Sequence, residues 1–228
     1  ENPLNSYISE EIFIHFNNCY FENNYCPKRG GALNYGKSKH TCNTQLEFYQ
    51  CKFIGNRAGQ PGGALSIQSY QSCEINQCEF IHNQDGAIFI ESEFNPQGAV
   101  STERPSSRKP GITITNSIFE KNEGTSTSCI VLGTTTSDTP FTINNCSFID
   151  CGTSELTGNA ITLTSNLKSI SIEDSFIEFI EITGFNGIKI QSGCSINLDH
   201  VEFIKTAQNS ALLIQSSSNP TITINNCV

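Results

Sequence analysis

FTINNCSFIDCGTSELTGNAITLTS, residues 141–165, holds one complete repeating unit of the chain. Apolar and polar residues alternate over 141–143, which is the pattern of a short β-strand. A break at Asn144-Asn145 follows, and the alternation resumes in the opposite parity over 146–148. After a polar segment, residues 160–163 alternate again. The stretch therefore predicts three short strands separated by corners.

The same unit recurs along the whole chain, with spacings of 26 to 39 residues between equivalent positions. The position after the first corner is held by Cys19, Cys51, Cys78, Ser117, Cys146, Ser175, Val201 and Cys227. Two residues further on stand Phe21, Phe53, Phe80, Phe119, Phe148, Ile177 and Phe203. The third strand supplies Leu33, Leu65, Ile88, Ile130, Ile161, Ile188 and Leu212. Columns that persist in this way are the signature of a repeat architecture.

A period of about 30 residues places each strand beside its equivalent one repeat away, because the columns match only in that register. We therefore predict an all-β protein, a right-handed parallel β-helix with about seven complete three-strand coils and a partial eighth. The hand follows from the general rule for crossovers between parallel strands. Asn occupies most first corners, as expected for a residue that tolerates the left-handed conformation. The corners of coils two, six and seven use Tyr49-Gln50, Glu173-Asp174 and Asp199-His200 instead.

The unbroken repeat predicts one β-helix domain over residues 1–228. Residues 1–11 form a lead-in to the first strand, and about 93–110 form an inserted loop. The sequence stops in mid-rung at Asn226-Cys227-Val228. An open β-helix end exposes strand edges and apolar columns. We therefore expect a segment of a longer helix, or a subunit that docks through its ends.

The charge and the apolar content of the chain limit the kinds of partner that it can bind. The formal net charge is −9, which disfavours nucleic acid and anionic membranes. No apolar run approaches the roughly 18 residues that a membrane helix needs. The expected partners are other copies of the chain, or neighbouring coils, through the open ends, and a glycan or protein of a host or matrix.

The eleven cysteines leave two interpretations open. Five of them, Cys19, Cys51, Cys78, Cys146 and Cys227, fall in one inward column, and buried free cysteine behaves as a small hydrophobe. A stack of reduced thiols follows from that view. Rungs about 4.8 Å apart also bring a bridge such as Cys51–Cys78 within disulfide range. The loop cysteines Cys26, Cys42, Cys151 and Cys194 are better disulfide candidates.

A short motif recurs in the first half of the chain. Phe-x-x-Asn occurs at 21–24, 53–56, 80–83 and 119–122, and the first three copies precede Gly-Gly-Ala-Leu or Gly-Ala-Ile. This pairing resembles the repeats of polymorphic outer-membrane proteins (Pmp), a family of bacterial surface adhesins with β-helical passenger domains. Similar repeats occur in large surface proteins of some protists. The resemblance covers about half the chain and implies an adhesive, surface-exposed protein.

A search for catalytic residues yields little, although many parallel β-helices are polysaccharide lyases and hydrolases. The densest acidic group is Asp150, Glu173, Asp174, Glu178 and Glu181, which we interpret as a solvated face. The sequence around Lys189 superficially suggests the basic substrate motif of pectin hydrolases, but Lys189 aligns with a variable outward column. The four histidines fall at different places in the repeat. No catalytic residue, metal site or cofactor is therefore predicted.

Basic residues gather in two excursions after the third strand of coils one and three. Seven of the 13 lie in or beside these loops, when Lys28 and Arg29 are included. A basic patch on an acidic rod can dock an acidic partner, whereas a solvated loop has no such role, and both interpretations stay open. The candidate binding residues are Lys37, Lys39, His40, Arg104, Arg108 and Lys109.

The leading hypothesis is a non-enzymatic extracellular or cell-surface protein, structural or adhesive, that assembles end to end into a filament. The alternative is a pectate lyase- or polygalacturonase-like enzyme or a glycan-binding module. Asn145 begins a sequon, Asn145-Cys146-Ser147, and is the candidate glycosylation site of a secreted protein.

Overall fold

A computed structural model of the chain gives the fold. It describes residues 11–36, 43–68, 72–92, 111–124, 128–134, 140–152, 159–164, 170–178, 186–191, 194–204, 210–215 and 221–228. In this part of the chain the regular structure is β-strand, arranged in three long parallel sheets and a short fourth one. The described residues contain no helix of the length and apolar character needed to cross a membrane.

The first sheet has eight strands and joins the first strand of each coil. In spatial order these are β1 (Glu11–Asn17), β5 (Asn43–Tyr49), β9 (Ser72–Asn76), β12 (Gly111–Thr115), β15 (Phe141–Asn144), β18 (Ile170–Glu173), β21 (Ser195–Asp199) and β24 (Thr221–Asn225). Glu11, which the sequence places in the lead-in, is thus the first residue of β1.

The second and third sheets have seven strands each. The second comprises β2 (Tyr20–Glu22), β6 (Lys52–Ile54), β10 (Glu79–Ile81), β13 (Ile118–Glu120), β16 (Ser147–Ile149), β19 (Phe176–Glu178) and β22 (Glu202–Ile204). The third comprises β4 (Leu33–Tyr35), β8 (Leu65–Gln68), β11 (Ile88–Ser92), β14 (Ile130–Thr134), β17 (Asn159–Leu163), β20 (Asn186–Ile190) and β23 (Leu212–Ile214).

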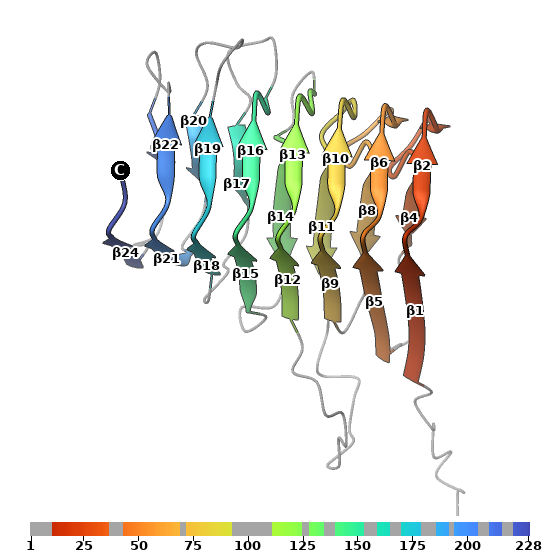
Figure 1. Ribbon diagram of the computed structural model, residues 1–228, viewed down its shortest axis with the longest axis horizontal. Helices are drawn as coiled ribbons and strands as arrows, with labels where there is room; N and C mark the ends of the chain where they lie inside the picture. Colours follow the sequence, from red (N-terminus) through yellow and green to blue (C-terminus); the bar gives the residue numbers. More distant parts are fainter. Residues whose placement is uncertain are drawn as a thin grey trace, which may run out of the picture.

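Each strand pairs in parallel with its equivalent in the next coil, and the predicted columns match residue for residue. The chain rises along the first two sheets on the near side, descends along the third behind them, and advances one rung per round (Figure 1). This path is right-handed. The prediction of a right-handed parallel β-helix is therefore confirmed, with seven rungs in every long sheet and an eighth in the first.

The inward columns form one continuous core. The phenylalanines of the second sheet stack face to face, with ring centroids 4.7–4.9 Å apart from Phe21 to Phe148. Phe53, Phe80, Phe119 and Phe148 are fully buried. Because parallel in-register pairing puts identical residues one above another, a column of like rings can pack in this way.

The corners explain why Asn recurs there. The second residue of every first corner has a positive φ, between 47° and 55°, at Asn18, Gln50, Gln77, Asn116, Asn145, Asp174, His200 and Asn226. The left-handed conformation predicted for the Asn corners is thus present even where Gln, Asp or His replaces Asn. The second corner repeats the device at Asn23, Gly55, His82, Lys121 and Asp150, which the sequence analysis missed.

The Asn of the Phe-x-x-Asn motif forms a buried ladder just after this second corner. Asn56, Asn83 and Asn122 are completely buried. The Oδ1 atom of Asn83 accepts hydrogen bonds from the backbone N–H and the Nδ2 group of Asn56, both at 3.0 Å. Its own Nδ2 donates to Phe53 O at 2.9 Å and to Asn122 Oδ1 at 2.8 Å. The motif therefore supplies hydrogen bonds that link successive coils inside the core.

The glycine pairs at 30–31 and 62–63 are needed because successive coils lie in close contact there. A Cβ atom on Gly31 would lie 2.3 Å from Gly63 O, and one on Gly63 would lie 2.1 Å from Gln84 O. No side chain fits at either position, because the backbone of the next coil passes too close. Beside these glycines, β3 (Tyr25–Cys26) and β7 (Arg57–Ala58) pair as the short fourth sheet.

Candidate functional site

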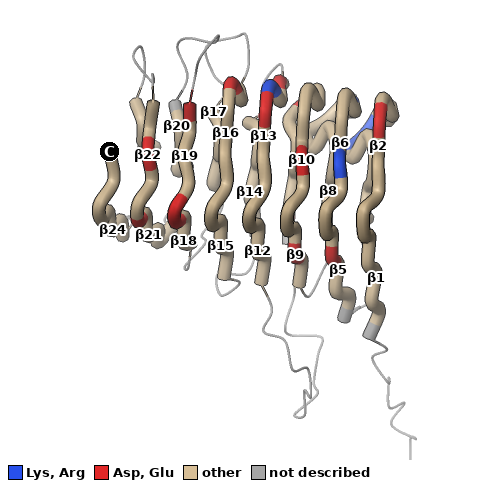
Figure 2. Tube along the Cα trace, in the orientation of Figure 1, with Lys and Arg blue, Asp and Glu red and all other residues tan. Residues whose placement is uncertain are grey.

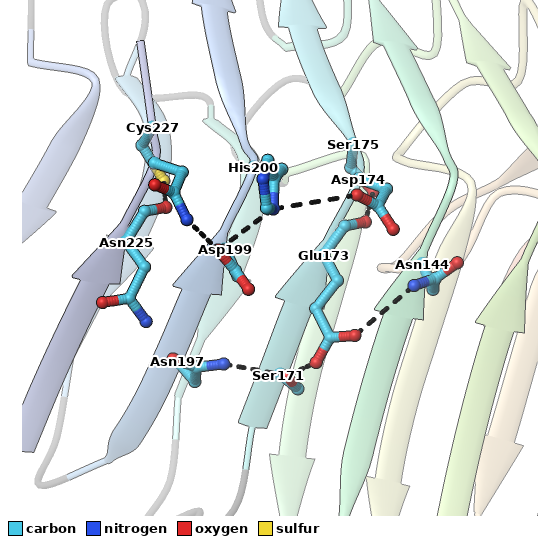
Figure 3. Close-up of polar contacts among 11 residues, drawn as sticks. Asn144, Ser171, Glu173, Asp174, Ser175, Asn197, Asp199, His200, Asn225 and Cys227 are labelled. Carbon is cyan, nitrogen blue, oxygen red and sulfur yellow. Dashed lines mark hydrogen bonds and ion pairs between the residues drawn. The ribbon is translucent and has the colours of Figure 1, made fainter.

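The outward face of the first sheet carries polar side chains over the rungs of β15, β18, β21 and β24. We call the residues Asn144, Ser171, Glu173, Asn197, Asp199 and Asn225 the polar strip (Figure 3). They occupy alternate positions of their strands, and the register places Asn144, Glu173, Asp199 and Asn225 in one column. Parallel pairing spaces the members of a column about 4.8 Å apart.

The strip is joined by hydrogen bonds that cross from strand to strand. Glu173 accepts from Ser171 Oγ on its own strand and from Asn144 Nδ2 at 3.5 Å on the preceding one. Asn197 Nδ2 donates to Ser171 Oγ at 3.5 Å. These contacts link four of the six strip residues along the sheet, namely Asn144, Glu173, Ser171 and Asn197.

The corner beyond the strip adds a charged group. His200 Nδ1 lies 3.1 Å from Asp199 Oδ1 and 4.0 Å from Asp174 Oδ1. Asn226 Nδ2 donates to Asp199 Oδ1 at 3.2 Å. The His200 and Asp174 side chains are about 60% exposed, and that of Asp199 is 35% exposed. The corner is therefore open to solvent and presents an imidazole ring and two carboxyl groups to a ligand.

Chemically, the strip presents amides, hydroxyls and carboxylates at regular intervals on a flat sheet. Such groups can donate to and accept from a hydroxyl-rich ligand. Glu173 and Asp199 lie in register on adjacent strands, the kind of paired carboxylates that glycoside hydrolysis requires. Both sit among hydrogen-bond donors on an open surface, unlike the apolar pocket that tunes a catalytic acid.

The acidic group expected from the sequence is only partly brought together. Asp150 is 1% exposed, so the prediction of a solvated position is wrong for this residue. It lies within the second corner, and its backbone N–H donates to Glu178 O at 2.9 Å, so the neighbouring coil covers it. Glu178 is the last residue of β19 on the second sheet. Glu181 lies outside the described residues.

The basic binding site stays a prediction, because Lys37, Lys39, His40, Arg104, Arg108 and Lys109 lie outside the described residues. Next to the first of these loops, Arg29 Nη1 lies 3.1 Å from Glu91 Oε2, and its guanidinium stacks over Phe89 at 4.3 Å. Arg29 therefore already holds partners on the third sheet.

The cysteine column is part of the core, as the predicted ladder requires. Cys51, Cys78 and Cys146 are buried, whereas Cys19 and Cys227 in the outermost coils are half-buried. All ten described cysteines are free thiols, and Cys42 lies outside the described residues. The Sγ atoms of Cys51, Cys78 and Cys146 donate to backbone carbonyls of the preceding coil. Burial raises the pKa of Cys78 to about 12 and that of Cys146 to about 11, so both stay neutral near pH 7.

Two cysteines assigned to loops from the sequence are buried instead. Cys151 takes the place of the next Asn in the ladder, with its Sγ 3.3 Å from Phe119 O and 3.8 Å from Asn122 Nδ2. Burial, followed by the hydrogen bond between the Cys129 and Cys151 side chains, raises the pKa of Cys129 well above its usual value. Cys194 is likewise completely buried. The burial of Cys151 could have been predicted from its spacing, because Cys151 follows Phe148 by three residues, as Asn follows Phe in the Phe-x-x-Asn motif.

The remaining candidates stand as follows. Asn145 is exposed at its corner, where its Nδ2 donates to Asn116 Oδ1 at 2.8 Å, and its glycosylation stays a prediction. Lys189 pairs with Thr162 and Leu213 in the expected column. Within the described ranges, no three His, Cys, Asp or Glu side chains are grouped to hold a metal ion. No protein-family model, curated protein or solved structure matches the chain.

Proposed function

We propose that this chain is a non-enzymatic β-helical protein of the cell surface or the extracellular space, with a structural or adhesive role. The observation that carries the proposal is the polar strip, a hydrogen-bonded row of Asn, Ser and carboxylate side chains on a rigid, repeating sheet. We propose that the strip binds a hydroxyl-rich polymer such as a glycan. The likeness of the Phe-x-x-Asn repeats to those of polymorphic outer-membrane adhesins supports the adhesive role.

The binding test removes two members of the strip together. Ser171→Ala with Asn197→Ala should raise the Kd for a retained polysaccharide about tenfold or more, because each lost hydrogen bond costs about 1 kcal/mol. The matched control, Asn34→Ala with Thr164→Ala, removes one amide and one hydroxyl from exposed positions elsewhere. Affinity electrophoresis against a panel of neutral and acidic polysaccharides gives the measurement. Equal losses in the two double variants would sink the assignment.

We also propose that the rod extends through its terminal rungs by pairing with further β-helix coils, from another copy or from the same chain. Each terminal strand of the first sheet, β1 and β24, has one partner strand among the described residues. Large apolar side chains there are exposed, with Phe13 at 58% and Ile224 at 56%. Electron microscopy of the purified chain should show particles much longer than the roughly 34 Å spanned by eight rungs. Discrete rods of that length would rule out association between copies.

A polysaccharide-cleaving enzyme is the second candidate, and one observation favours it. Glu173 and Asp199 form an in-register pair of carboxylates with Asp174 and His200 beside them. If this pair is catalytic, an acidic polysaccharide should be cleaved in the presence or absence of calcium, and Asp199→Asn should abolish the cleavage. Under the non-enzymatic proposal, the parent and Asp199→Asn proteins both release no product.

A further inference from the structure

The outward face of the second sheet has a composition unlike that of the first. Its strands are three residues long, and in each the middle residue points into the core while the outer two point outward. Every one of the seven rungs places one large apolar or aromatic residue among these outward positions. They are Tyr20, Ile54, Ile81, Ile118, Ile149, Phe176 and Ile204, which we call the apolar track.

The other outward position of each rung is charged in six cases out of seven. These residues are Glu22, Lys52, Glu79, Glu120, Ser147, Glu178 and Glu202. Lys52 is paired with Glu79 at 2.9 Å. Within the described part of the chain, no salt bridge joins Glu22, Glu120, Glu178 or Glu202 to a basic residue. Acidic positions recur along this sheet in Figure 2.

The side chains of the apolar track are exposed enough for a partner to contact them. Tyr20 is 57% exposed and Ile118 is 41% exposed, and the other five members are half-buried. Strand propensity alone does not explain it, because Ile also suits the outward positions of the first sheet. There the outward columns contain two large aromatic residues, Phe13 and Tyr49, and otherwise glycine, polar or charged residues in the described rungs. On the second sheet the register places Tyr20 beside Lys52 and Ile118 beside Glu79, so apolar and charged side chains are interleaved across the two outward columns. A face that combines exposed large apolar side chains with charged ones is typical of an interaction site.

The negative charge of the glutamates on the second sheet favours some binding partners over others. A second copy docked through the same face would oppose five glutamates with five others, and an anionic membrane surface would be repelled in the same way. A segment that combines apolar residues with Lys or Arg can pack against the apolar side chains of this surface and pair with its glutamates. From the first rung to the seventh the track runs about 29 Å, and a helix of about 20 residues has that length.

We propose that the second sheet is a docking surface for a cationic amphipathic polypeptide segment. Its apolar side chains lie along the apolar track, and its basic side chains pair with Glu22, Glu120, Glu178 and Glu202. Helices that dock in this way present apolar residues at i, i+3, i+4 and i+7. The surface belongs to a different sheet from the polar strip, so the two proposals succeed or fail separately.

The probe is a 20-residue amphipathic Leu/Lys peptide, compared with a peptide of the same composition whose apolar periodicity is scrambled. Fluorescence anisotropy should show that the amphipathic peptide binds at least about tenfold more tightly. Glu120→Lys with Glu178→Lys should weaken its binding at least about tenfold. The matched control, Glu47→Lys with Glu74→Lys, makes the same change in net charge on the first sheet and should alter Kd by less than about threefold.

A second variant tests the apolar half. Ile118→Thr with Ile149→Thr keeps β-branched residues in β13 and β16 and should remove the preference for the amphipathic peptide over the scrambled one. Circular dichroism and thermal unfolding check that each variant keeps the fold. Equal affinity for the two peptides, or equal losses in the two charge-reversal pairs, would overturn the proposal. Dimerisation of the chain that Glu120→Lys abolishes would also overturn it, in favour of a second copy as occupant.

Discussion

Asn83 shows how much of this fold depends on single polar side chains. Its side-chain amide accepts two hydrogen bonds from Asn56 of the preceding coil, and it donates to Phe53 O of that same coil and to Asn122 Oδ1 of the following coil. Its exposed fraction is zero. A buried polar group whose hydrogen bonds are all formed stabilises a fold. When one partner is removed, the remaining donors and acceptors are buried without a hydrogen bond, which is costly.

Replacing this residue should therefore be costly. Asn83→Ala leaves the backbone N–H of Asn56 and the carbonyl of Phe53 without their partner, and each such loss costs about 1–3 kcal/mol. We expect the free energy of unfolding in urea to fall by about 3 kcal/mol or more. Asn76→Ala is the control, because it removes a similar side-chain contact in an exposed ladder and should cost less than about 1 kcal/mol. Similar costs for both variants would refute a special role for the buried ladder.

The cysteine column makes the stability depend on pH. The folded pKa values of Cys78 and Cys146 are raised, mainly by burial, from 9.0 to about 12 and about 11. Their contribution is complete below pH 9 and is lost as the pH rises towards 11 and 12, because the unfolded thiols release protons first. Between pH 8 and pH 10 the two thiols together should remove roughly 2–3 kcal/mol of stability.

The column itself supplies the variant for this test. Ser117 and Ser175 occupy equivalent positions and make similar hydrogen bonds through Oγ. Cys78→Ser with Cys146→Ser should thus keep the packing and lose the titration. Urea unfolding at pH 8 and pH 10 should show a smaller fall for this variant than for the parent. Parallel pH profiles would mean that the thiols are not the titrating groups.

At the scale of the element, each short strand is stable because its neighbours in the stack place similar apolar residues at the same inward position. Strands of three residues have little stability of their own, and here the stacked rings of the second sheet hold them. Phe119 lies between Phe80 and Phe148 at 4.9 and 4.8 Å.

Phe119→Ala should lower the free energy of unfolding by about 3–5 kcal/mol, since it opens a cavity in the middle of the column. On the same strand, Ile118→Ala changes an outward side chain that is 41% exposed and should cost about 1 kcal/mol or less. Thermal and urea unfolding of the two variants give the comparison. A cost at Phe119 no greater than that at Ile118 would contradict the view that the stacked rings hold the sheet.

The strands also show what the sequence could predict. Alternation within a run and identity between runs gave the sheets, their register and the inward columns, because both signals come from residues that must be buried. The apolar track was not predicted because a three-residue strand offers only two outward positions, and the apolar residue is first in β2, β13 and β19 but third in the other four strands. The buried state of Asp150 and Cys151 depends on the second corner, whose left-handed turn has no fixed residue type.

At the scale of the whole molecule, repetition makes every face a regular surface. The same winding that stacks the core also lines up the polar strip on the first sheet and the apolar track on the second. Their positions follow from the register, but their ligands do not, because specificity depends on side chains that the fold leaves free to vary. The adhesive role and the location outside the cell stay proposals for the same reason.

The most direct test of the central proposal, binding without turnover, measures retention and cleavage in one sample. The chain is incubated with each polysaccharide of a panel, with and without calcium, and both bound polymer and new chain ends are quantified. We predict retention that Ser171→Ala with Asn197→Ala weakens, and no new chain ends at any time. Product that grows with protein concentration and disappears in Asp199→Asn would contradict the proposal and make the carboxylates of the strip a catalytic pair.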